Sequence, residues 1–411
     1  MEFTGIKRNL YSQVIDLLEY FPVVVILGAR QVGKTTLSKQ VAPNWKYLDL
    51  ENPRDYDNFT TDPIFVFERY SQKLIIDEAQ EYPDLFKILR GVIDANRNQK
   101  GRYILTGSSN PELKDHVAET LAGRVATIEL GTLKANEYYD KPLSQFYDLF
   151  KQKLSKENLV SGAPPLTQKE LNYMWLRGGF PEPIQYNDAQ YQTWMQKYFD
   201  SYINRDLAKL FPKLNKIAYS RFINILGSLS GSILNKANIG RAVEVHESTI
   251  REYLEIAGGT YIFRLLLSYE KSKTKSIVKM PKGYIRDTGL IHYLQKINDN
   301  ESLYNNQIVG RSFESFVIEE LLKGIEAAGI SNVNSSYYRT RNGAEIDLIL
   351  DGYFGTLPIE IKYGSTVLSR QLQTLERFVI ENKLPFGMII NQSKQVEWLR
   401  PNIIQIPVGW L

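Results

Sequence analysis

The residues best suited to chemistry in this chain form a glycine-containing loop near the amino terminus. The loop runs from Gly28 to Gly33, is followed by Lys34 and Thr35, and lies between an apolar run at 23–27 and a stretch with helical spacing. Glycines let the backbone curl so that successive N–H groups point at phosphate oxygens, and the following helix adds the positive end of its dipole. Lys34 is then placed to reach the β- and γ-phosphates of a nucleotide, and Thr35 to coordinate Mg²⁺ through its hydroxyl. The residues expected to contact the nucleotide are Gly28, Ala29, Arg30, Gln31, Val32, Gly33, Lys34, Thr35 and Thr36.

A second apolar run, at 73–76, ends in two carboxylates, Asp77 and Glu78. Ligands of parallel α/β sheets bind at the carboxyl ends of the strands, so both side chains are expected at the sheet edge that holds the phosphate loop. Asp77 would hold the Mg²⁺ shell, while Glu78 would orient and deprotonate the attacking water. The alternative is an exposed strand end without a catalytic role, but the preceding phosphate loop favours the nucleotide site.

Three further side chains belong to less specific patterns. Thr106 and Ser108 end another short strand, and their hydroxyls either position the hydrolytic water and sense the γ-phosphate or satisfy their own turn. Arg124 follows a predicted helix and is suited to neutralising transition-state charge on the nucleotide of a neighbouring subunit. An isolated arginine does not by itself indicate a catalytic role.

The carboxyl-terminal part of the chain carries a second candidate site. Asp347 lies in one predicted strand, and Glu360 and Lys362 lie in the next, where period-two alternation places them on the same face. Metal-assisted phosphodiester cleavage needs carboxylates that hold Mg²⁺ and a lysine that stabilises or activates the nucleophile, and Glu314 on the preceding helix is a further candidate ligand. The alternative is a salt bridge between Glu360 and Lys362 on a solvated strand, with Asp347 as a strand-end charge.

Positive charge is concentrated between residues 215 and 290, which hold 12 Lys and Arg against 6 Asp and Glu, whereas the whole chain has a net charge of +4. Helical patterns at 219–229, 235–243 and 245–254 have the spacing of a helix-turn-helix, and 261–285 would form a wing. The residues expected to contact DNA are Ser248, Arg251, Lys271, Lys273 and Lys275. Three glutamates on the third helix argue against this role because they would repel a DNA backbone. A structural or protein-binding role therefore stays open.

Composition excludes several classes of protein. Hydrophobic residues make up 43% of the chain and charged residues 23%, and no apolar run approaches the ~20 residues that a membrane span requires. The first residues lack the apolar core and cleavage site of a secretory signal, so we expect a cytoplasmic protein without a membrane partner. The chain has 0 cysteines and 3 histidines. Thiolate sites are therefore excluded, and oxygen ligands with hard cations such as Mg²⁺ are favoured.

Together these residues resemble a family over nearly the whole chain: bacterial and archaeal AAA-type ATPases that carry a C-terminal domain of unknown function. The motifs that carry the resemblance are Gly28–Thr36, Asp77-Glu-Ala-Gln80, Leu105–Ser109, Leu121–Arg124, Arg177–Pro181, Tyr284–Leu290 and the Glu314…Asp347…Glu360-x-Lys362 set. The resemblance implies an ATPase core, a winged helix and a terminal domain similar to the PD-(D/E)xK nuclease fold. It also makes Arg124 a candidate arginine finger and Arg177 a nucleotide-sensing residue of the lid.

The expected fold class is α/β, because apolar strands alternate with helical stretches over the amino-terminal third of the chain. The resemblance adds a P-loop NTPase (AAA+) core with a parallel sheet, a helical lid, a winged helix-turn-helix and a C-terminal α/β restriction-endonuclease-like domain. The expected boundaries are 1–140 for the ATPase core, 141–213 for a loop and the lid, 214–300 for the winged helix-turn-helix and 301–411 for the nuclease-like domain.

Two functions are compatible with the sequence. The first is a Mg²⁺-dependent ATPase that acts in association with DNA, with nuclease activity in the C-terminal domain as a further candidate. The second is an interaction protein switched by ATP, in which the winged helix and the terminal domain are non-catalytic docking modules for a protein partner. A homo-oligomer is expected from the candidate arginine finger, since such a cation acts on the nucleotide of a neighbour.

Overall fold

The computed structural model describes residues 5–70, 73–108, 119–270, 279–340 and 342–411. The chain divides into two units, one of residues 1–133 with 259–261 and one of residues 134–258 with 262–411. Within the described ranges, no helix is long and apolar enough to cross a membrane.

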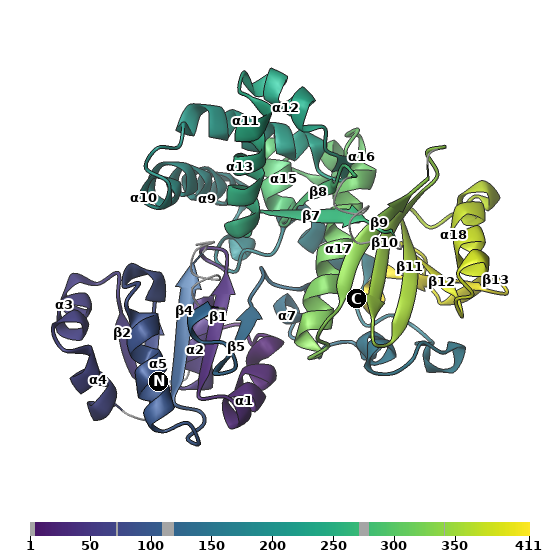
Figure 1. Ribbon diagram of the computed structural model, residues 1–411. Coiled ribbons are helices and arrows are strands. Elements are labelled where there is room, and N and C mark those ends of the chain that lie inside the picture. Colours follow the sequence, from purple (N-terminus) through teal and green to yellow (C-terminus); the bar gives the residue numbers. More distant parts are fainter. Residues whose placement is uncertain (1–4, 71–72, 109–118, 271–278, 341) are drawn as a thin grey trace. The chain divides into compact units, whose positions relative to one another are not determined.

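A parallel β-sheet lies at the centre of the first unit (Figure 1). Its described strands are β1 (Val23–Gly28), β2 (Lys46–Asp49), β3 (Leu74–Asp77), β4 (Tyr103–Ser108) and β5 (Val125–Glu129), in the order β2-β3-β4-β1-β5. Each neighbouring pair is parallel, which confirms the predicted α/β class with a parallel-sheet core. The register sets Gly28 beside Ser108 and Asp49 beside Asp77. The phosphate loop and the acidic strand end therefore share one edge of the sheet.

Helices pack against this sheet, and caps explain where two of them begin. The helical elements are α1 (Leu10–Tyr20), α2 (Lys34–Val41), α3 (Pro53–Thr61), α4 (Pro63–Arg69), the 3₁₀ turn η1 (Ala79–Glu81) and α5 (Leu85–Ala95). The side chains of Asn52 and Asp62 each accept a backbone hydrogen bond from the first turn of the next helix, and a proline follows each of them. Both features favour a helix start. α2 covers the stretch for which the sequence predicts a helix.

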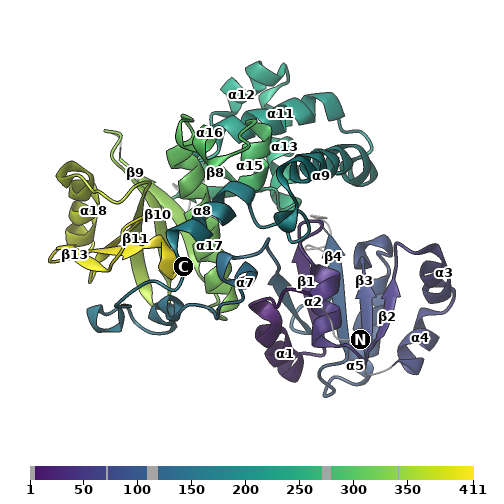
Figure 2. The same ribbon diagram turned by 180° about the vertical axis from the view of Figure 1, so that it is seen from behind.

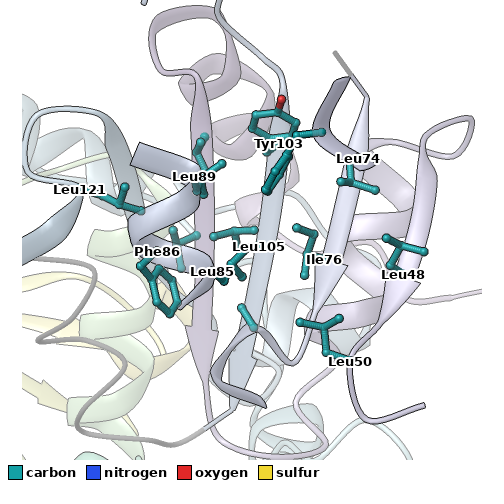
Figure 3. Packing of buried hydrophobic residues seen from close by; sticks show 14 of the residues in the cluster. Leu48, Leu50, Leu74, Ile76, Leu85, Phe86, Leu89, Tyr103, Leu105 and Leu121 are labelled. Carbon is teal, nitrogen blue, oxygen red and sulfur yellow. The ribbon is translucent and has the colours of Figure 1, made fainter. Parts of the chain in front are cut away.

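The hydrophobic core of this unit holds α5 against the sheet. Leu85, Phe86 and Leu89 project from α5 toward Leu105 on β4 (Figure 3). Each of these side chains is buried, and such burial contributes roughly 1.5–3 kcal/mol per side chain. The same core includes Leu48, Leu50, Leu74, Ile76, Tyr103 and Leu121. Since α5 follows closely after β3, this packing also holds the turn that carries the acidic residues.

The second unit begins with helices and short turns. These are α7 (Ala135–Tyr138), η2 (Gln145–Lys151), η3 (Lys156–Asn158), α8 (Gln168–Arg177), η4 (Pro183–Gln185), α9 (Asp188–Ser201), the π-helical turn η5 (Tyr202–Asp206) and α10 (Leu207–Leu210). The two 3₁₀ turns η2 and η3 lie in the first part of the region predicted as a loop and lid, 141–213. Between η2 and η3, Leu154 donates a backbone hydrogen bond of 3.0 Å to the carbonyl of Phe354, which lies in the turn between two C-terminal strands.

In the described residues from 216 to 285, a group of three helices and three strands follows. Its elements are α11 (Lys216–Leu229), β6 (Ser232–Ile233), α12 (Lys236–Val243), α13 (Glu247–Gly259), β7 (Phe263–Ser268) and β8 (Lys282–Ile285). β8 pairs antiparallel with both β6 and β7. The helices lie close to the three predicted ranges, and β7 and β8 lie inside the predicted wing.

One large sheet continues from this group to the end of the chain (Figures 1 and 2). The remaining elements are α15 (Thr288–Leu294), α16 (Asn300–Tyr304), α17 (Val309–Ala327), β9 (Asn334–Arg339), β10 (Glu345–Gly352), β11 (Gly355–Lys362), α18 (Ser369–Glu381), β12 (Gly387–Asn391), β13 (Glu397–Arg400), β14 (Ile403–Pro407) and η6 (Val408–Trp410). The described strands run in the order β13-β14-β12-β11-β10-β9-β7-β8-β6. The link is a parallel pairing in which Leu267 of β7 lies beside Ser336 of β9.

Candidate functional site

The phosphate loop has a backbone shape that requires its glycines. A Cβ on Gly28 would lie 2.2 Å from the carbonyl oxygen of Leu130, which is far inside contact distance. Gly33 has φ 96°, in the left-handed region that favours glycine, and it caps the start of α2. Gln31 also has a positive φ, of 62°. The loop therefore curls between β1 and α2 as the phosphate-binding geometry requires.

Lys34 is folded over this loop. Its side chain is buried, with 6% exposed, and its Nζ donates hydrogen bonds to the carbonyl oxygens of Gly28 at 3.2 Å and Ala29 at 2.9 Å. These partners are neutral carbonyls, so phosphate oxygens would be stronger acceptors for the ammonium. Lys34 is thus positioned at the loop that would cradle the phosphates.

Asp77 is the centre of the hydrogen-bond network at the end of β3. Its Oδ2 accepts from the hydroxyl of Thr35 at 2.7 Å and from the phenol of Tyr47 at 2.6 Å, and its Oδ1 accepts from the hydroxyl of Thr106. Asp77 is only 4% exposed. Three residues that the sequence predicts as site residues, Thr35, Asp77 and Thr106, are therefore in direct contact.

Thr35 and Asp77 suit Mg²⁺, which needs oxygen ligands and is commonly held by one or two protein groups together with substrate phosphates and water. Over the part of the chain that the structure describes, no group of three or more acidic or histidine side chains is placed to hold a metal ion. A site of this type therefore depends on the nucleotide for its remaining ligands.

Glu78 has a strained backbone and a held side chain. Its φ of 52° lies in the left-handed region, which non-glycine residues adopt at a cost of order 1–3 kcal/mol. Its carboxylate accepts a 2.6 Å hydrogen bond from the side-chain amide of Gln80, and its backbone N–H donates to Thr106 at 3.4 Å. The turn thus directs the carboxylate away from the strand. The sequence does not indicate a role for Gln80, so its contact with Glu78 is an addition from the structure.

Tyr47 is a site residue that the sequence did not reveal. Burial and its hydrogen bond to Asp77 raise the pKa of the Tyr47 phenol well above its usual range, so it remains a donor to the carboxylate. The alternation of β2 places Tyr47 and Asp49 on the same face, and the parallel register brings that face beside Asp77. This alternation is the pattern from which the contact could have been found.

Arg8 is a second such residue, and no motif in the sequence indicates it. Its guanidinium is buried and donates to the carbonyl oxygen of Val32 at 2.7 Å and to that of Gly131 at 2.8 Å. Val32 lies in the phosphate loop, while Gly131 follows β5. Arg8 therefore ties the loop to the neighbouring strand end and holds its shape.

Arg8→Ala is expected to weaken ATP binding about tenfold. Hydrogen bonds from charged groups contribute ~1.5–3 kcal/mol, and about 1.4 kcal/mol corresponds to a tenfold change in affinity. The measurement is a fluorescence titration with a labelled ATP analogue, with Arg69→Ala as a control because Arg69 is exposed on α4. Equal affinities of the two variants and the unsubstituted protein would show that Arg8 does not shape the loop.

The other predicted nucleotide-site residues have contacts outside this network. Ser108 ends β4 beside Gly28, and its side chain lies outside the described residues. Arg124 makes a two-pronged ion pair with Asp94 of α5, at 2.8 Å and 3.0 Å. Its role as an arginine finger stays a prediction, and it would require Arg124 to exchange Asp94 for a neighbour's nucleotide.

Arg177 lies in the second unit, at the end of α8. Its guanidinium pairs with Asp188 and lies over the ring of Tyr191, 4.5 Å from the ring centroid. The following Gly178 leaves no room for a Cβ beside Asp287, whose carboxylate accepts a 2.8 Å hydrogen bond from the backbone of Gly179. The two motifs at 177–181 and 284–290 therefore pack against each other. Contact of Arg177 with a nucleotide stays a prediction.

The predicted C-terminal carboxylates Glu314, Asp347 and Glu360 come together, and the structure adds Glu345 to them through Lys282; we call these four residues the carboxylate cluster. Lys362 pairs with Glu360 at 2.5 Å and with Asp347 at 3.7 Å. Burial, with the nearby charge of Asp347, raises the pKa of Glu360 to about 8 and that of Glu314 to about 7. The predicted Glu360–Lys362 salt bridge is present. The carboxylates of Glu360 and Asp347 are both buried, so this strand face is not solvated.

A lysine that the sequence did not indicate also enters the carboxylate cluster. Lys282 of β8 lies 2.6 Å from Glu314, 2.6 Å from Glu345 and 3.4 Å from Asp347. Because its ammonium uses the oxygens that a Mg²⁺ ion would need, the cluster as arranged does not suit a divalent metal. No step of metal-assisted cleavage can be derived from this geometry.

The predicted DNA contacts are only partly covered by the structure. Arg251 is exposed on α13, whereas the hydroxyl of Ser248 forms a 2.8 Å hydrogen bond with the ring of His246 at the start of that helix. Lys271, Lys273 and Lys275 lie outside the described residues. Glu247, Glu252 and Glu255 are also exposed on α13, so the helix carries both signs of charge.

Family models match three consecutive parts of the chain. An AAA domain matches residues 20–139, a domain of unknown function (DUF8612) matches residues 168–301, and another (DUF4143) matches residues 309–411. The first of these contains the phosphate loop and both acidic residues of the nucleotide site. The description of the last does not include nuclease activity.

Two relatives match this chain over most of its length. The uncharacterized protein Rv2008c of Mycobacterium tuberculosis is 31% identical over 373 residues, which cover 90% of this chain and 76% of the relative. An uncharacterized protein of Haemophilus influenzae is 23% identical over 80% of this chain and 81% of its own length. Among solved structures, the Walker-type ATPase PABY2304 of Pyrococcus abyssi matches with a TM-score of 0.42 at 14% identity, over 71% of this chain and 96% of that one.

Proposed function

This chain belongs to the family of AAA-domain proteins that includes the M. tuberculosis relative, and we propose that it binds ATP with Mg²⁺ and hydrolyses it. The observation that supports this most strongly is the hydrogen bond between Thr35 and Asp77, 2.7 Å long, directly beside the phosphate loop. It joins the two side chains that we propose as Mg²⁺ ligands, at the carboxyl edge of the parallel sheet, where α/β proteins bind ligands.

Each residue of the site then has one task. Lys34 exchanges the loop carbonyls for phosphate oxygens and stabilises the charge that develops on them. Thr35 and Asp77 hold Mg²⁺, which neutralises phosphate charge when it is bound. Glu78 accepts a proton from the attacking water, while Gln80 keeps its carboxylate in place.

The test is a steady-state ATP hydrolysis assay with the unsubstituted protein and Lys34→Ala. We expect Mg²⁺-dependent turnover in the unsubstituted protein and at least a tenfold loss of ATP affinity in the variant, since a charge-assisted contact to phosphate is removed. Lys87→Ala is the control, because its ammonium is exposed and pairs only weakly with Asp84 at 3.5 Å. Turnover that survives Lys34→Ala or the removal of Mg²⁺ would contradict the proposed site.

DNA association is the second part of the proposal. It is supported by the order of α11, α12 and α13 followed by the hairpin of β7 and β8, and by the excess of positive charge in residues 215–290. The same assay tests it when duplex DNA is added at several salt concentrations. Stimulation of hydrolysis that declines as salt rises would support phosphate contacts.

The competing function is an ATP-switched docking protein. It is favoured by three exposed glutamates on α13, whose one basic residue is Arg251, and by a carboxylate cluster that does not suit a metal. Tight ATP binding with negligible turnover, unchanged by DNA, would support this function and contradict the first. A homo-oligomer in which Arg124 acts on the nucleotide of a neighbour remains part of the ATPase proposal. Nuclease activity depends on whether a divalent metal ion or the Lys282 ammonium occupies the carboxylate cluster.

A further inference from the structure

The ammonium of Lys282 is buried among carboxylates of the C-terminal domain. Lys282 is 3% exposed, and its Nζ lies within 3.4 Å of Glu314, Glu345 and Asp347. An ammonium has three N–H donors, so one is available for each carboxylate. Those charges also raise the pKa of Lys282 far above its usual range, against the opposing effect of burial. Lys282 is therefore a cation whose whole hydrogen-bonding capacity is directed into the carboxylate cluster.

The position of Lys282 is set by tight packing of the strand that carries it. On β8, a Cβ added to Gly283 would lie 2.4 Å from the ring of Phe263 and 2.7 Å from Leu234. The next residue, Tyr284, donates a 2.6 Å hydrogen bond from its phenol to Glu314. Two alternate residues of β8, Lys282 and Tyr284, thus reach the carboxylate cluster. The lysine is held there by the fold and is not a mobile surface side chain.

β8 belongs to the hairpin with β7, which the sequence assigns to the wing of a helix-turn-helix. The parallel pairing of β7 with β9, in which Leu267 lies beside Ser336 and Ser268 beside Tyr337, makes this hairpin part of the C-terminal sheet. The hairpin therefore has a structural use besides any contact with a partner: it carries a counter-charge to Glu314 and Asp347.

A divalent cation and this ammonium compete for the same oxygens. Hard cations bind carboxylate oxygens at about 2.0–2.6 Å, so a metal ion held by Glu314 and Asp347 would lie between oxygens that Lys282 already contacts. A metal ion and the Lys282 ammonium that contact the same carboxylate oxygens in a buried site would repel each other strongly. Glu360 retains one buried oxygen, Oε2, without a hydrogen-bond partner, so the cluster has acceptor capacity left if Lys282 is removed.

We propose that Lys282 is an internal cation of the carboxylate cluster that excludes divalent metal ions from the C-terminal domain. The wing strand β8 thereby keeps the cluster in a form that does not cleave phosphodiesters by a metal-assisted route. Displacement of β8, or loss of the ammonium, would open a metal site formed by Glu314, Asp347 and Glu360.

The experiment measures Mn²⁺ binding by electron paramagnetic resonance, without nucleotide, in the full-length protein. Each form is compared with the same form carrying Asp347→Asn, so that Mn²⁺ at the nucleotide site cancels. The unsubstituted protein is expected to show no Mn²⁺ binding that depends on Asp347. Lys282→Met is expected to bind one additional Mn²⁺, with an affinity at least tenfold higher than that of the same site in the unsubstituted protein. Adding Asp347→Asn to Lys282→Met should abolish this binding. Lys282→Arg, which keeps a cation, should behave as the unsubstituted protein does.

Stability measurements guard against a misfolded variant. Lys282→Met removes the ammonium that pairs with Glu314 and Glu345, so its thermal unfolding is recorded with and without Mn²⁺. Mn²⁺ should raise the unfolding temperature of Lys282→Met and leave that of its Asp347→Asn form unchanged. The proposal is overturned by Asp347-dependent Mn²⁺ binding in the unsubstituted protein, a result that needs no variant of Lys282. It is equally overturned by a folded Lys282→Met that gains no Mn²⁺.

Discussion

Glu78→Gln is expected to bind ATP as tightly as the unsubstituted protein does and to hydrolyse it about 10²- to 10⁴-fold more slowly. The backbone N–H of Glu78 donates to Thr106, and its carbonyl accepts from Glu81 in the η1 turn. The amide keeps the size of the side chain and its place beside Gln80, but it cannot accept a proton from water at neutral pH. The substitution therefore removes the base and preserves the binding site.

Single-turnover hydrolysis and equilibrium ATP binding, measured on the same preparation, separate these two effects. Asp84→Asn is the matched control, because Asp84 lies six residues further along in an exposed position, where it forms an exposed ion pair with Lys87. Its turnover should equal that of the unsubstituted protein. If Glu78→Gln hydrolyses ATP at a rate within threefold of normal, the base is another residue. If it fails to bind ATP, Glu78 contributes to nucleotide binding, and the expectation that the substitution preserves the binding site is wrong.

Much of the nucleotide site can be predicted from sequence because its parts are local. The loop from Gly28 to Thr35 is one continuous segment, and Asp77 directly follows a buried strand. A parallel sheet then brings the two together, since all of its strands end at one edge. Local pattern and simple topology are sufficient for these contacts.

Tyr47 and Arg8 could not be predicted with the same ease. Tyr47 reaches Asp77 only because β2 is the neighbour of β3 in the sheet, which depends on strand order. Arg8 lies 24 residues before its partner Val32 and more than 120 before Gly131, and no periodic pattern relates such positions. Both side chains act through packing of whole elements, which sequence patterns describe poorly.

The carboxylate cluster shows even more clearly that contacts between distant strands are hard to predict from sequence. Asp347, Glu360 and Lys362 were predicted to be neighbours because they lie on two adjacent strands, and β10 and β11 do pair. The partner that decides their chemistry, Lys282, comes from β8 and lies 65 residues before Asp347. It enters only because β7 pairs with β9 and joins two parts of the sheet. Charge alone placed Lys282 in the basic region with the candidate DNA contacts.

Glu320→Gln is expected to lower the free energy of unfolding of the second unit by about 3–5 kcal/mol. Glu320 of α17 pairs with Lys134 at 3.2 Å, and both side chains are buried. Burial raises the pKa of Glu320, but the ammonium groups of Lys134 and Lys323 outweigh it and lower the pKa below its usual value. The other partners of the Lys134 ammonium are neutral: the phenol of Tyr147 at 3.0 Å and the Glu320 carbonyl at 2.7 Å. Glutamine therefore leaves a buried positive charge without a carboxylate.

Urea unfolding followed by tryptophan fluorescence measures this loss, because four of the five tryptophans lie in residues 134–411. The double variant Lys134→Met with Glu320→Gln should be more stable than Glu320→Gln alone, since it removes the unpaired ammonium along with its partner. Asp148→Asn is the matched control, because its ion pair with Lys151 at 2.7 Å is exposed and should contribute less than about 1 kcal/mol. A loss in Glu320→Gln no larger than that of the control would mean that Lys134 sheds its proton or finds water when its partner is neutral, and that this pair does not hold α17 against the segment following the ATPase core.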